Sequence, residues 1–348
     1  MADNSLKHKK ILIIELDNLG DAVMASFLPR VLKQLYPGSY IAVLLKEYTR
    51  DVFAHNPQVD ELILFNPSWS RDQLKKEATW AQYRQMIGKI KAGGFKLAVI
   101  VNADWRKALM AKLARIPERV GANKKKAGYF LTKKVAFKED FKKHAVEYNL
   151  DLMRSLGYKE EKVELEVFID DDTRSWAHDV LDKNNFGPDD MLIGIHPGAG
   201  HPARIWPAGN FINLINELTK EKYVKVMVVG YHGDQVIKEI KDKLNKYKVI
   251  VLWDVSVLQM AALFQRCACV IAQDSGPMHL AVAVGTRVAA IFGPSNPLQF
   301  GPYGEGHTVI REEISCSPCG SDPECHKLSC LSNLTVAKVL KVVQTLVK

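Results

Sequence analysis

Short, almost continuous runs of apolar residues recur along the first half of the chain, with stretches of helical spacing between them. Runs that are apolar throughout are typical of strands buried on both faces of a parallel sheet. The alternation of strands and helices therefore predicts a parallel sheet covered by helices. The predicted strands are 9–16, 40–45, 59–65 and 96–101, and the predicted helices are 22–35, 47–55 and 73–92, with Pro29 breaking or kinking the first helix.

A second series of the same kind begins at residue 191, after a polar segment rich in Asn, Asp, Gly and Pro. We expect two doubly wound α/β domains of the Rossmann type, residues 1–172 and 191–348, joined by a linker and hinge at 173–190. Such folds bind ligands where strand carboxyl ends meet helix N-termini, so the expected site is a cleft between the domains. The predicted strands are 192–196, 224–230, 249–252, 269–272 and 288–292, and the predicted helices are 176–181, 207–218, 234–244, 256–266 and 278–284.

Charge is distributed unevenly between these two halves. The whole chain carries 48 Lys and Arg against 39 Asp and Glu, which gives a net charge of +9. Residues 1–150 hold 27 basic and 15 acidic side chains, whereas residues 151–348 hold 21 and 24. A basic half joined to a near-neutral half indicates an anionic partner on one side. Nucleic acid, anionic lipid and a phosphorylated or acidic sugar all fit this pattern.

Composition and hydropathy exclude several classes of protein. Apolar residues make up 47% and charged residues 25%, as in ordinary globular proteins, which excludes a chain disordered throughout. No apolar run reaches the roughly 18 residues of a transmembrane helix. Residues 1–10 lack the apolar centre of a signal peptide, so we expect a cytoplasmic protein.

Leu19, Gly20 and Asp21 join the first predicted strand to the first predicted helix. A glycine there permits a tight turn with exposed amides, and a helix N-terminus attracts anions. Asp21 fits two roles, a helix cap or a general base at the mouth of the predicted cleft.

Two polar, glycine-containing loops follow strands of the second half. The first reads HPGAG (196–200) and leads to RIWP (204–207), and the second reads QDSGPMHL (273–280). Neither has the glycine spacing of a P-loop or a dinucleotide fingerprint. Free amides in both loops, including those of Ser275, Gly276 and Met278, and the planar donors of Arg204 predict a phosphate site. The candidate residues are His196, Gly198, Gly200, Arg204, Asp274, Ser275, Gly276, Met278 and His279.

These motifs, in this order, resemble those of a known family. LGDAV (19–23), HPGAG, the basic residue before WP, DSGPMHLAVAVGT (274–286) and FGPSNP (292–297) are similar to the motifs of the ADP-heptose:lipopolysaccharide heptosyltransferases, glycosyltransferase family 9. The resemblance covers roughly residues 9–345. It implies the GT-B fold, in which two Rossmann-like domains face each other across a cleft.

The resemblance also implies a reaction, the inverting transfer of a heptose from an ADP-sugar to the anionic inner core of a lipopolysaccharide precursor. No cofactor would be required, Asp21 would be the base, and Arg204 would replace a lysine that contacts the donor diphosphate. Asp234 would lie near the ribose, and Asp274 would orient loop amides or sugar hydroxyls. A glycolipid acceptor would bring the protein to the cytoplasmic face of the inner membrane. The acceptor-binding residues would be Leu19, Gly20, Arg106, Lys107, Lys124, Lys125 and Lys126.

Six cysteines form two groups. Cys267 and Cys269 lie in an apolar stretch and are expected to be buried small hydrophobes. Cysteines 316, 319, 325 and 330, with His326 beside them, form a cluster with enough ligands for a tetrahedral Zn or an iron site. Their spacings do not match a zinc ribbon, so reduced or loop-stapling thiols stay open as well.

Other functions also fit the pattern. Within the same family, the donor could be another sugar nucleotide or the acceptor a protein. A different class, a nucleotide-sensing protein that binds nucleic acid, would use the basic half. The sequence contains no recognised nucleic-acid motif, and its lysines are not interleaved with stacking aromatics, which argues against that class.

Overall fold

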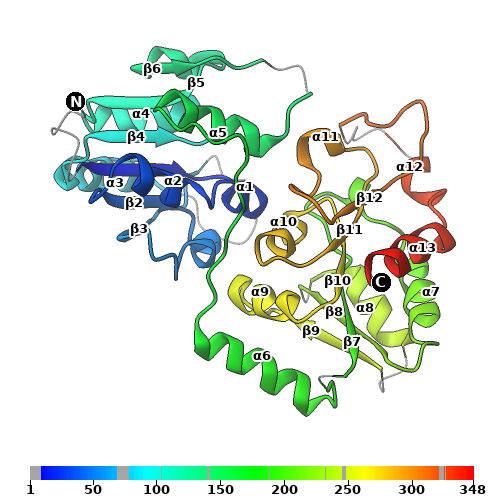
Figure 1. Cartoon of the computed structure of the whole chain (residues 1–348). Helices are drawn as coiled ribbons and strands as arrows, with labels where there is room; N and C mark the ends of the chain where they lie inside the picture. The colour runs from blue at the N-terminus through cyan, green and yellow to red at the C-terminus, as the bar shows by residue number, and fades with distance from the viewer. Residues whose placement is uncertain are drawn as a thin grey trace. The chain divides into compact units, whose positions relative to one another are not determined.

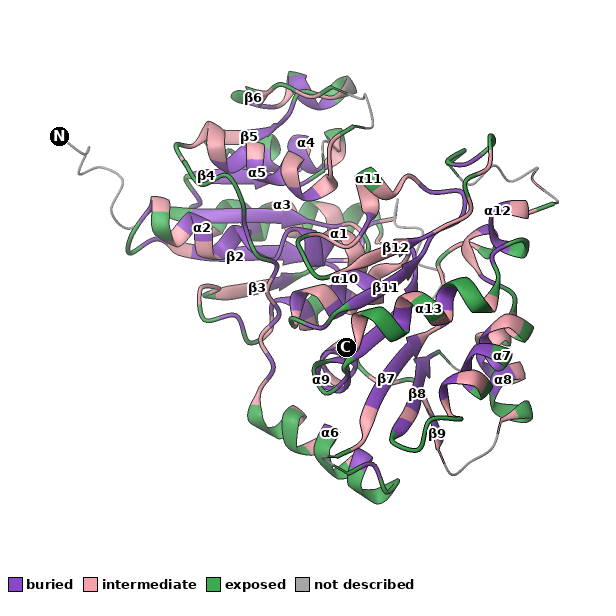
Figure 2. Ribbon diagram, turned by 45° about the vertical axis from the view of Figure 1, so that its right-hand side comes forward, coloured by how far each residue is buried: buried purple, intermediate pink, exposed green. Residues whose placement is uncertain are grey.

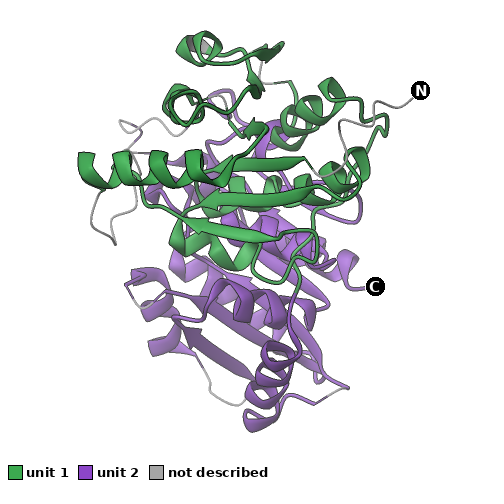
Figure 3. Ribbon diagram, turned by 90° about the vertical axis from the view of Figure 1, so that its left-hand side faces the viewer, with its two compact units in different colours: residues 1–168 green, residues 169–348 purple. Residues whose placement is uncertain are grey.

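The structure, a computed structural model, describes residues 9–68, 78–102, 104–138, 142–187, 189–231, 233–244, 248–320, 325 and 327–348. The chain divides into two compact units, Met1–Phe168 (unit 1) and Ile169–Lys348 (unit 2) (Figure 3). Helix α6 (Asp171–Lys183) covers much of the predicted linker and packs against α9 (Val257–Gln265) of unit 2. Asp170 begins α6 as its N-cap, accepting a hydrogen bond from the amide of Thr173 at 2.9 Å.

Unit 1 contains a parallel sheet with the strand order β3-β2-β1-β4-β5-β6 (Figure 1). This order is that of a Rossmann fold, and its direction reverses between β1 and β4. The strands are β1 (Lys10–Glu15), β2 (Tyr40–Leu45), β3 (Glu61–Leu64), β4 (Leu97–Ile100), β5 (Glu118–Ala122) and β6 (Lys133–Val135). The helices are α1 (Leu19–Met24), α2 (Leu28–Leu35), η2 (Glu47–Val52), α3 (Trp80–Gly93), α4 (Trp105–Leu113), η3 (Lys125–Tyr129) and α5 (Ala145–Ser155).

Unit 2 repeats the arrangement, with the strand order β9-β8-β7-β10-β11-β12 and every described pair parallel. Its order reverses between β7 and β10. The strands are β7 (Met191–His196), β8 (Val224–Gly230), β9 (Val249–Trp253), β10 (Cys269–Gln273), β11 (Val288–Ile291) and β12 (Thr308–Ile310). Besides α6 and α9, the helices are η4 (Pro202–Arg204), α7 (Ala208–Leu218), α8 (Gln235–Lys243), α10 (Gly276–Ala283), α11 (Pro297–Phe300), α12 (Ser329–Ser332) and α13 (Val336–Leu346).

Most predicted elements are confirmed, and the exceptions have local causes. The predicted helix 22–35 breaks before Pro29, which lies in the first turn of α2, where its missing N–H costs no hydrogen bond. The predicted helix 47–55 is the shorter 3-10 helix η2. The predicted helix 73–92 begins within the described residues at Trp80, capped by Thr79. Its residues 73–77 lie outside the described part of the chain.

Strands β5, β6 and β12 were not predicted. The sequence of β6 is KKV and that of β12 is TVI, each only three residues long, and β5 is a mixed stretch, ERVGA. Both β6 and β12 lie at the edges of their sheets. Edge strands are short and polar in many proteins because one side of their backbone faces solvent. The apolar pattern that reveals a central strand is therefore absent from them.

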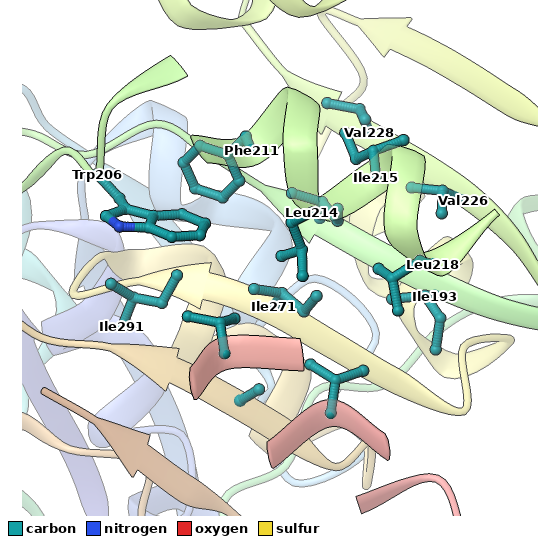
Figure 4. Packing of buried hydrophobic residues seen from close by; sticks show 14 of the residues in the cluster. Ile193, Trp206, Phe211, Leu214, Ile215, Leu218, Val226, Val228, Ile271 and Ile291 are labelled. Atoms are coloured by element: carbon teal, nitrogen blue, oxygen red, sulfur yellow. The ribbon is translucent and has the colours of Figure 1, made fainter. Parts of the chain in front are cut away.

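The central strands of both sheets are buried along almost their whole length (Figure 2). In unit 2 the core is built around Trp206, whose ring packs edge-on against Phe211 with ring centroids 5.0 Å apart (Figure 4). The indole Nε1 of Trp206 donates to the carbonyl of Leu334 at 3.0 Å, just before α13. The WP pair of the RIWP segment (204–207) is thus a core anchor, which holds Arg204 two residues upstream. Within the described residues, no helix has the length and apolarity needed to cross a bilayer.

Candidate active site

The first cluster of polar side chains lies in unit 1 where β1 and β4 end side by side. Asn18 caps α1, and Oδ2 of Asp21 accepts a hydrogen bond from the amide of Asn18 at 3.2 Å. Asp21 therefore takes part in capping α1 as the third residue of the helix, whereas the N-cap residue itself is Asn18. The other oxygen, Oδ1, accepts from the side-chain amide of Asn102 at 3.1 Å, so capping occupies only one end of the carboxylate. Leu19 and Gly20 begin α1 and are half-buried.

Behind Asp21 lies a group of charged side chains that the sequence did not reveal. Glu15 and Lys107 are completely buried. The ammonium group of Lys107 bonds to Oδ2 of Asp17 and donates to the carbonyl of Val101 at 3.1 Å. The amide of Asp17 donates to Oε2 of Glu15 at 2.9 Å. The prediction that Lys107 belongs to a basic surface is therefore wrong, because its charge is enclosed and paired.

This environment changes the proton affinity of the carboxyl groups. Burial, followed by the charge of Asp17, raises the pKa of Asp21 to about 6. Burial also raises the pKa of Glu15 well above its usual range, and again the charge of Asp17 adds to the effect. Burial alone would lower the pKa of Lys107, but the charges of Asp17 and Glu15 outweigh it and raise that pKa. A carboxyl with a pKa near 6 is suited to accept a proton at neutral pH.

The other members of the predicted basic patch have separate surroundings. Arg106 pairs with Asp104 at 2.6 Å, and the ammonium group of Lys124 lies 4.6 Å from the centroid of the Phe137 ring. Lys126 is exposed in η3. The side chain of Lys125 lies outside the described part of the structure.

A cavity of about 730 Å³ lies in unit 1 at the carboxyl ends of strands β2 and β3, and the sequence did not predict it. Glu47 and Asn66, which follow β2 and β3, contribute to one wall. Gln82, Gln85 and Lys89 of α3 contribute to another. These side chains offer neutral and charged hydrogen-bonding groups rather than a purely apolar lining.

The second cluster lies in unit 2 where β7 and β10 end side by side, with His196 opposite Ala272 in the register. The HPGAG loop follows β7 and the DSGP loop follows β10, so the two predicted phosphate loops are neighbours. Burial lowers the pKa of His196 to about 4, so its imidazole is neutral at pH 7. The side chain of Gln273 was given no role in the sequence analysis. Its side-chain amide forms two hydrogen bonds with the backbone of the RIWP segment. The amide nitrogen donates to the carbonyl of Arg204 at 2.9 Å, and the amide oxygen accepts from the N–H of Trp206 at 2.7 Å.

An ion pair joins the two loops. Nη1 of Arg204 lies 3.0 Å from Oδ2 of Asp274, whose side chain is almost fully buried. Burial raises the pKa of Asp274, while the charge of Arg204 and the nearby Ser295 hydroxyl act in the opposite direction. Asp274 thus orients Arg204 within the loop cluster. An arginine held in this way can present its remaining N–H groups to a phosphate.

Gly198 and Asp234 meet at the same place. Asp234 caps α8, accepting from the amide of Val236 at 2.9 Å. A Cβ atom at position 198 would come within 2.4 Å of Oδ2 of Asp234, so a larger residue there would force the Asp234 carboxylate to shift. In contrast, a Cβ at Gly200 would meet no atom within 4 Å. The neighbouring His232 lies outside the described residues.

Helix α10 begins with Ser275 as its N-cap and Gly276 as its first residue. The amide of Met278 donates to the carbonyl of Ser275 at 3.1 Å, and its side chain is fully buried. The prediction of a free Met278 amide is therefore wrong, because the helix has already begun to use its backbone donors. His279 is also buried, at 3% exposure. Ser275 and Gly276 lie at the N-terminus of α10, and their contact with a ligand stays a prediction.

The cysteines divide as predicted into a buried pair and a terminal group. Cys267 and Cys269 are buried, and burial raises the pKa of both thiols. In the terminal group Cys330 is buried, and its thiol pKa is raised by burial and by Cys319, Cys316 and Cys325. Among the described residues, no three or more His, Cys, Asp or Glu side chains are grouped so that they could hold a metal ion. His326 lies outside that part of the chain.

The terminal cysteine segment is attached to the loop after β11. The hydroxyl of Ser317 donates to the carbonyl of Gly293 at 2.8 Å, and the amide of Cys319 donates to that of Pro294 at 2.9 Å. The FGPSNP motif therefore serves as a docking point for this segment, in addition to the cap that Asn296 provides for α11.

Comparison with known proteins agrees with this arrangement. The model of glycosyltransferase family 9 (heptosyltransferase) matches residues 83–328, and the chain belongs to this family. It is therefore a glycosyltransferase, and its two Rossmann-like units are those of the GT-B fold. The resemblance seen in the motifs is confirmed.

Individual relatives extend over most of the chain. The lipooligosaccharide heptosyltransferase 2 of Haemophilus ducreyi is 26% identical over 323 residues, which cover 87% of this chain and 88% of the relative. Among solved structures, a family 9 glycosyl transferase from Veillonella parvula has a TM-score of 0.82 at 25% identity, with 98% of each chain covered. The E. coli ADP-heptose lps heptosyltransferase II has a TM-score of 0.79 at 22% identity, covering 97% of this chain and 98% of that structure.

Proposed function

We propose that this chain transfers a heptose from an ADP-heptose donor to an anionic lipopolysaccharide inner-core acceptor, with inversion and without a catalytic metal. The observation that carries the proposal is the place of the two polar clusters. Each lies at the point where its sheet reverses strand order, which is the ligand site of doubly wound folds. The names of the Haemophilus and E. coli relatives supply the heptose, the adenine nucleotide and the lipopolysaccharide.

In the proposed reaction the loops of unit 2 bind the donor. The guanidinium of Arg204 and the amides near Gly198, Gly200, Ser275 and Gly276 hold the diphosphate, which gains charge as the glycosidic bond breaks. Asp234 contacts the ribose. The ion pair with Asp274 fixes the direction of Arg204 and leaves part of its donor set for the phosphate.

Asp21 of unit 1 then acts as the base. As the acceptor oxygen forms its bond to the anomeric carbon, the bond to ADP breaks and the hydroxyl proton passes to the Asp21 carboxylate. The pKa near 6 predicts that kcat/KM falls as the pH drops below about 6, because the protonated carboxyl cannot accept a proton. Arg106, Lys124 and Lys126 are the remaining described members of the proposed basic acceptor surface.

The decisive experiment measures ADP release and glycolipid product with ADP-heptose and a deacylated inner-core acceptor. Asp21→Asn is expected to lower kcat by about 100-fold or more while leaving ADP affinity unchanged. NMR of the product reports whether the anomeric centre is inverted, and turnover in EDTA tests the absence of a catalytic metal. Transfer that persists in Asp21→Asn would remove Asp21 from the role of base.

Donor identity is tested by calorimetry with ADP, UDP, GDP and CDP. We expect ADP to bind best and Arg204→Ala to weaken it about 10-fold or more. Preference for UDP or GDP would keep the glycosyltransferase and overturn the ADP-heptose donor. RNA binding with a steep salt dependence, in place of nucleotide binding, would favour the nucleic-acid alternative. A protein acceptor would be revealed by labelled sugar on polypeptide rather than glycolipid.

The proposed function carries three further predictions. Closure about residues 173–190 would bring donor and base to one reaction. Contact with the inner membrane would follow from a glycolipid acceptor, and vesicle sedimentation measures it. A structural Zn or Fe ion at cysteines 316, 319, 325 and 330 would be bound through their four sulfur atoms. Elemental analysis of the purified protein tests the last one, and less than about 0.1 metal per chain would remove it.

A further inference from the structure

Asn102 links the candidate base to the charges behind it. It follows β4, and its side-chain nitrogen donates to Oδ1 of Asp21 at 3.1 Å and to Oδ2 of Asp17 at 3.0 Å. One amide group has two N–H bonds, so a single side chain can serve both carboxylates. The backbone of Asn102 has a φ of +48°, in the left-handed region that asparagine tolerates better than most residues.

Lys107 supplies the positive charge of the cluster. Its enclosed ammonium group bonds to Asp17, which also receives the amide of Asn102. A buried ammonium is stable only with such partners. The charge of Lys107 is nevertheless too small to balance Glu15, Asp17 and Asp21 together. Among the described residues, Arg106 interacts with Asp17 and Asp104 interacts with Lys107. The hydroxyl of Tyr48 in η2 donates to Oδ1 of Asn18 at 3.2 Å.

We propose that Asn102 and the Lys107–Asp17 pair are positioning residues that orient the Asp21 carboxylate and set its charge for the transfer reaction. The inference rests on the proposed role of Asp21 as the base. It assigns a function to three residues that the sequence motifs did not mark as a unit. It also explains why a lysine in the predicted basic patch is enclosed instead of facing an acceptor.

The geometry gives each group a separate effect. The Asn18 amide holds Oδ2 of Asp21 and the Asn102 side chain holds Oδ1, so the carboxylate plane is fixed from both ends. Each oxygen keeps a second acceptor site for a substrate hydroxyl. Lys107 favours the ionised form of Asp21, whereas Asp17 opposes it. Removing Lys107 and removing Asp17 should therefore change the reaction in opposite directions.

The test compares pH profiles of kcat/KM for wild type, Lys107→Met and Asp17→Asn. Lys107→Met is expected to move the acidic limb up by about one pH unit, and Asp17→Asn to move it down by a similar amount. A general loss of structure would weaken both variants without opposite shifts. If both variants turn over with an unshifted limb, the positioning role is overturned, although Asp21-dependent transfer would still stand.

If Lys107→Met and Asp17→Asn do not fold, the Asn102→Gly variant provides a second test of the proposal. Glycine accepts the same backbone conformation and removes the amide, so we expect kcat to fall about 10-fold with unchanged ADP affinity. Asn185→Gly is the matched control, because Asn185 is also left-handed, with a φ of +60°, and lies on the surface of unit 2. Equal kcat values for Asn102→Gly and wild type would overturn the role of Asn102. Transfer that does not depend on Asp21 would instead overturn the proposed function and this inference together.

Discussion

Replacing Asp21 by asparagine should stabilise the folded protein at neutral pH while it removes the proposed base. A carboxyl whose pKa is raised on folding holds its proton more tightly in the folded state. Stability is therefore lost as the pH rises from the unfolded pKa toward the folded one. For Asp21 these values are 3.8 and about 6, so ionisation costs about 3 kcal/mol at pH 7.5.

The neutral amide of the Asp21→Asn variant would not carry that cost. It keeps only one acceptor oxygen, so the variant would lose one of the two hydrogen bonds that Asp21 accepts from Asn18 and Asn102. Such a bond contributes about 1 kcal/mol, which leaves a net gain of about 2 kcal/mol. For a unit of this size the gain corresponds to a rise in Tm of about 4 to 8 °C. At pH 4.5 the electrostatic gain falls to about 1 kcal/mol, and the lost hydrogen bond cancels it.

Differential scanning calorimetry of wild type and Asp21→Asn at both pH values measures the effect. Asp179→Asn, an exposed position on α6, serves as the control and should leave Tm unchanged at either pH. A variant that is no more stable than wild type at pH 7.5 would show that the Asp21 carboxylate is not electrostatically strained. A gain of the same size at pH 4.5 would show that charge is not its cause.

Four further substitutions, at Gly198, Gly200 and Trp206, test unit 2. Gly198→Ala should weaken ADP binding about 10-fold or more because its Cβ would displace the Asp234 carboxylate, whereas Gly200→Ala should bind ADP normally. Calorimetric titration compares them, and equal affinities would refute the close approach. Trp206→Phe should lose about 1 kcal/mol with its hydrogen bond to Leu334, and Trp206→Ala about 3 to 5 kcal/mol with its packing. Urea unfolding followed by circular dichroism measures both, and similar losses would contradict the assignment of Trp206 as a core anchor.

The fold could be predicted from the sequence because its central strands are buried on both faces. That burial demands uninterrupted apolar runs such as ILII in β1 and VMVV in β8, which are visible without any structure. Helix ends were also visible where a single residue determines them, as with Ser256, which caps α9. Helices α4 and α5 were not predicted. Helix α4 has only a weak apolar stripe, whereas α5 buries Val146, Leu150 and Met153 at helical spacing, a pattern that the prediction missed.

The candidate site was predictable in part for a related reason. The loops at Asp21, Gly198 and Ser275 stand directly after recognisable strands, so their place in the fold follows from the order of the elements. The roles of Asn102 and Gln273 did not show in the sequence. Each side chain forms hydrogen bonds with residues of another loop. The sequence does not indicate with which distant residue a side-chain amide will form a hydrogen bond.

The sequence by itself determined the two parallel sheets, the family and the loops that carry polar chemistry, because these depend on local patterns of apolar residues and glycines. Only the tertiary structure decided how charges are paired. Lys107 looks like any other lysine of a basic segment, yet folding encloses it beside Asp17. Arg204 could have been a free phosphate ligand, yet folding pairs it with Asp274. The energy of a charge depends on burial and on neighbours distant in sequence, and these exist only once the sheet has brought its strand ends together.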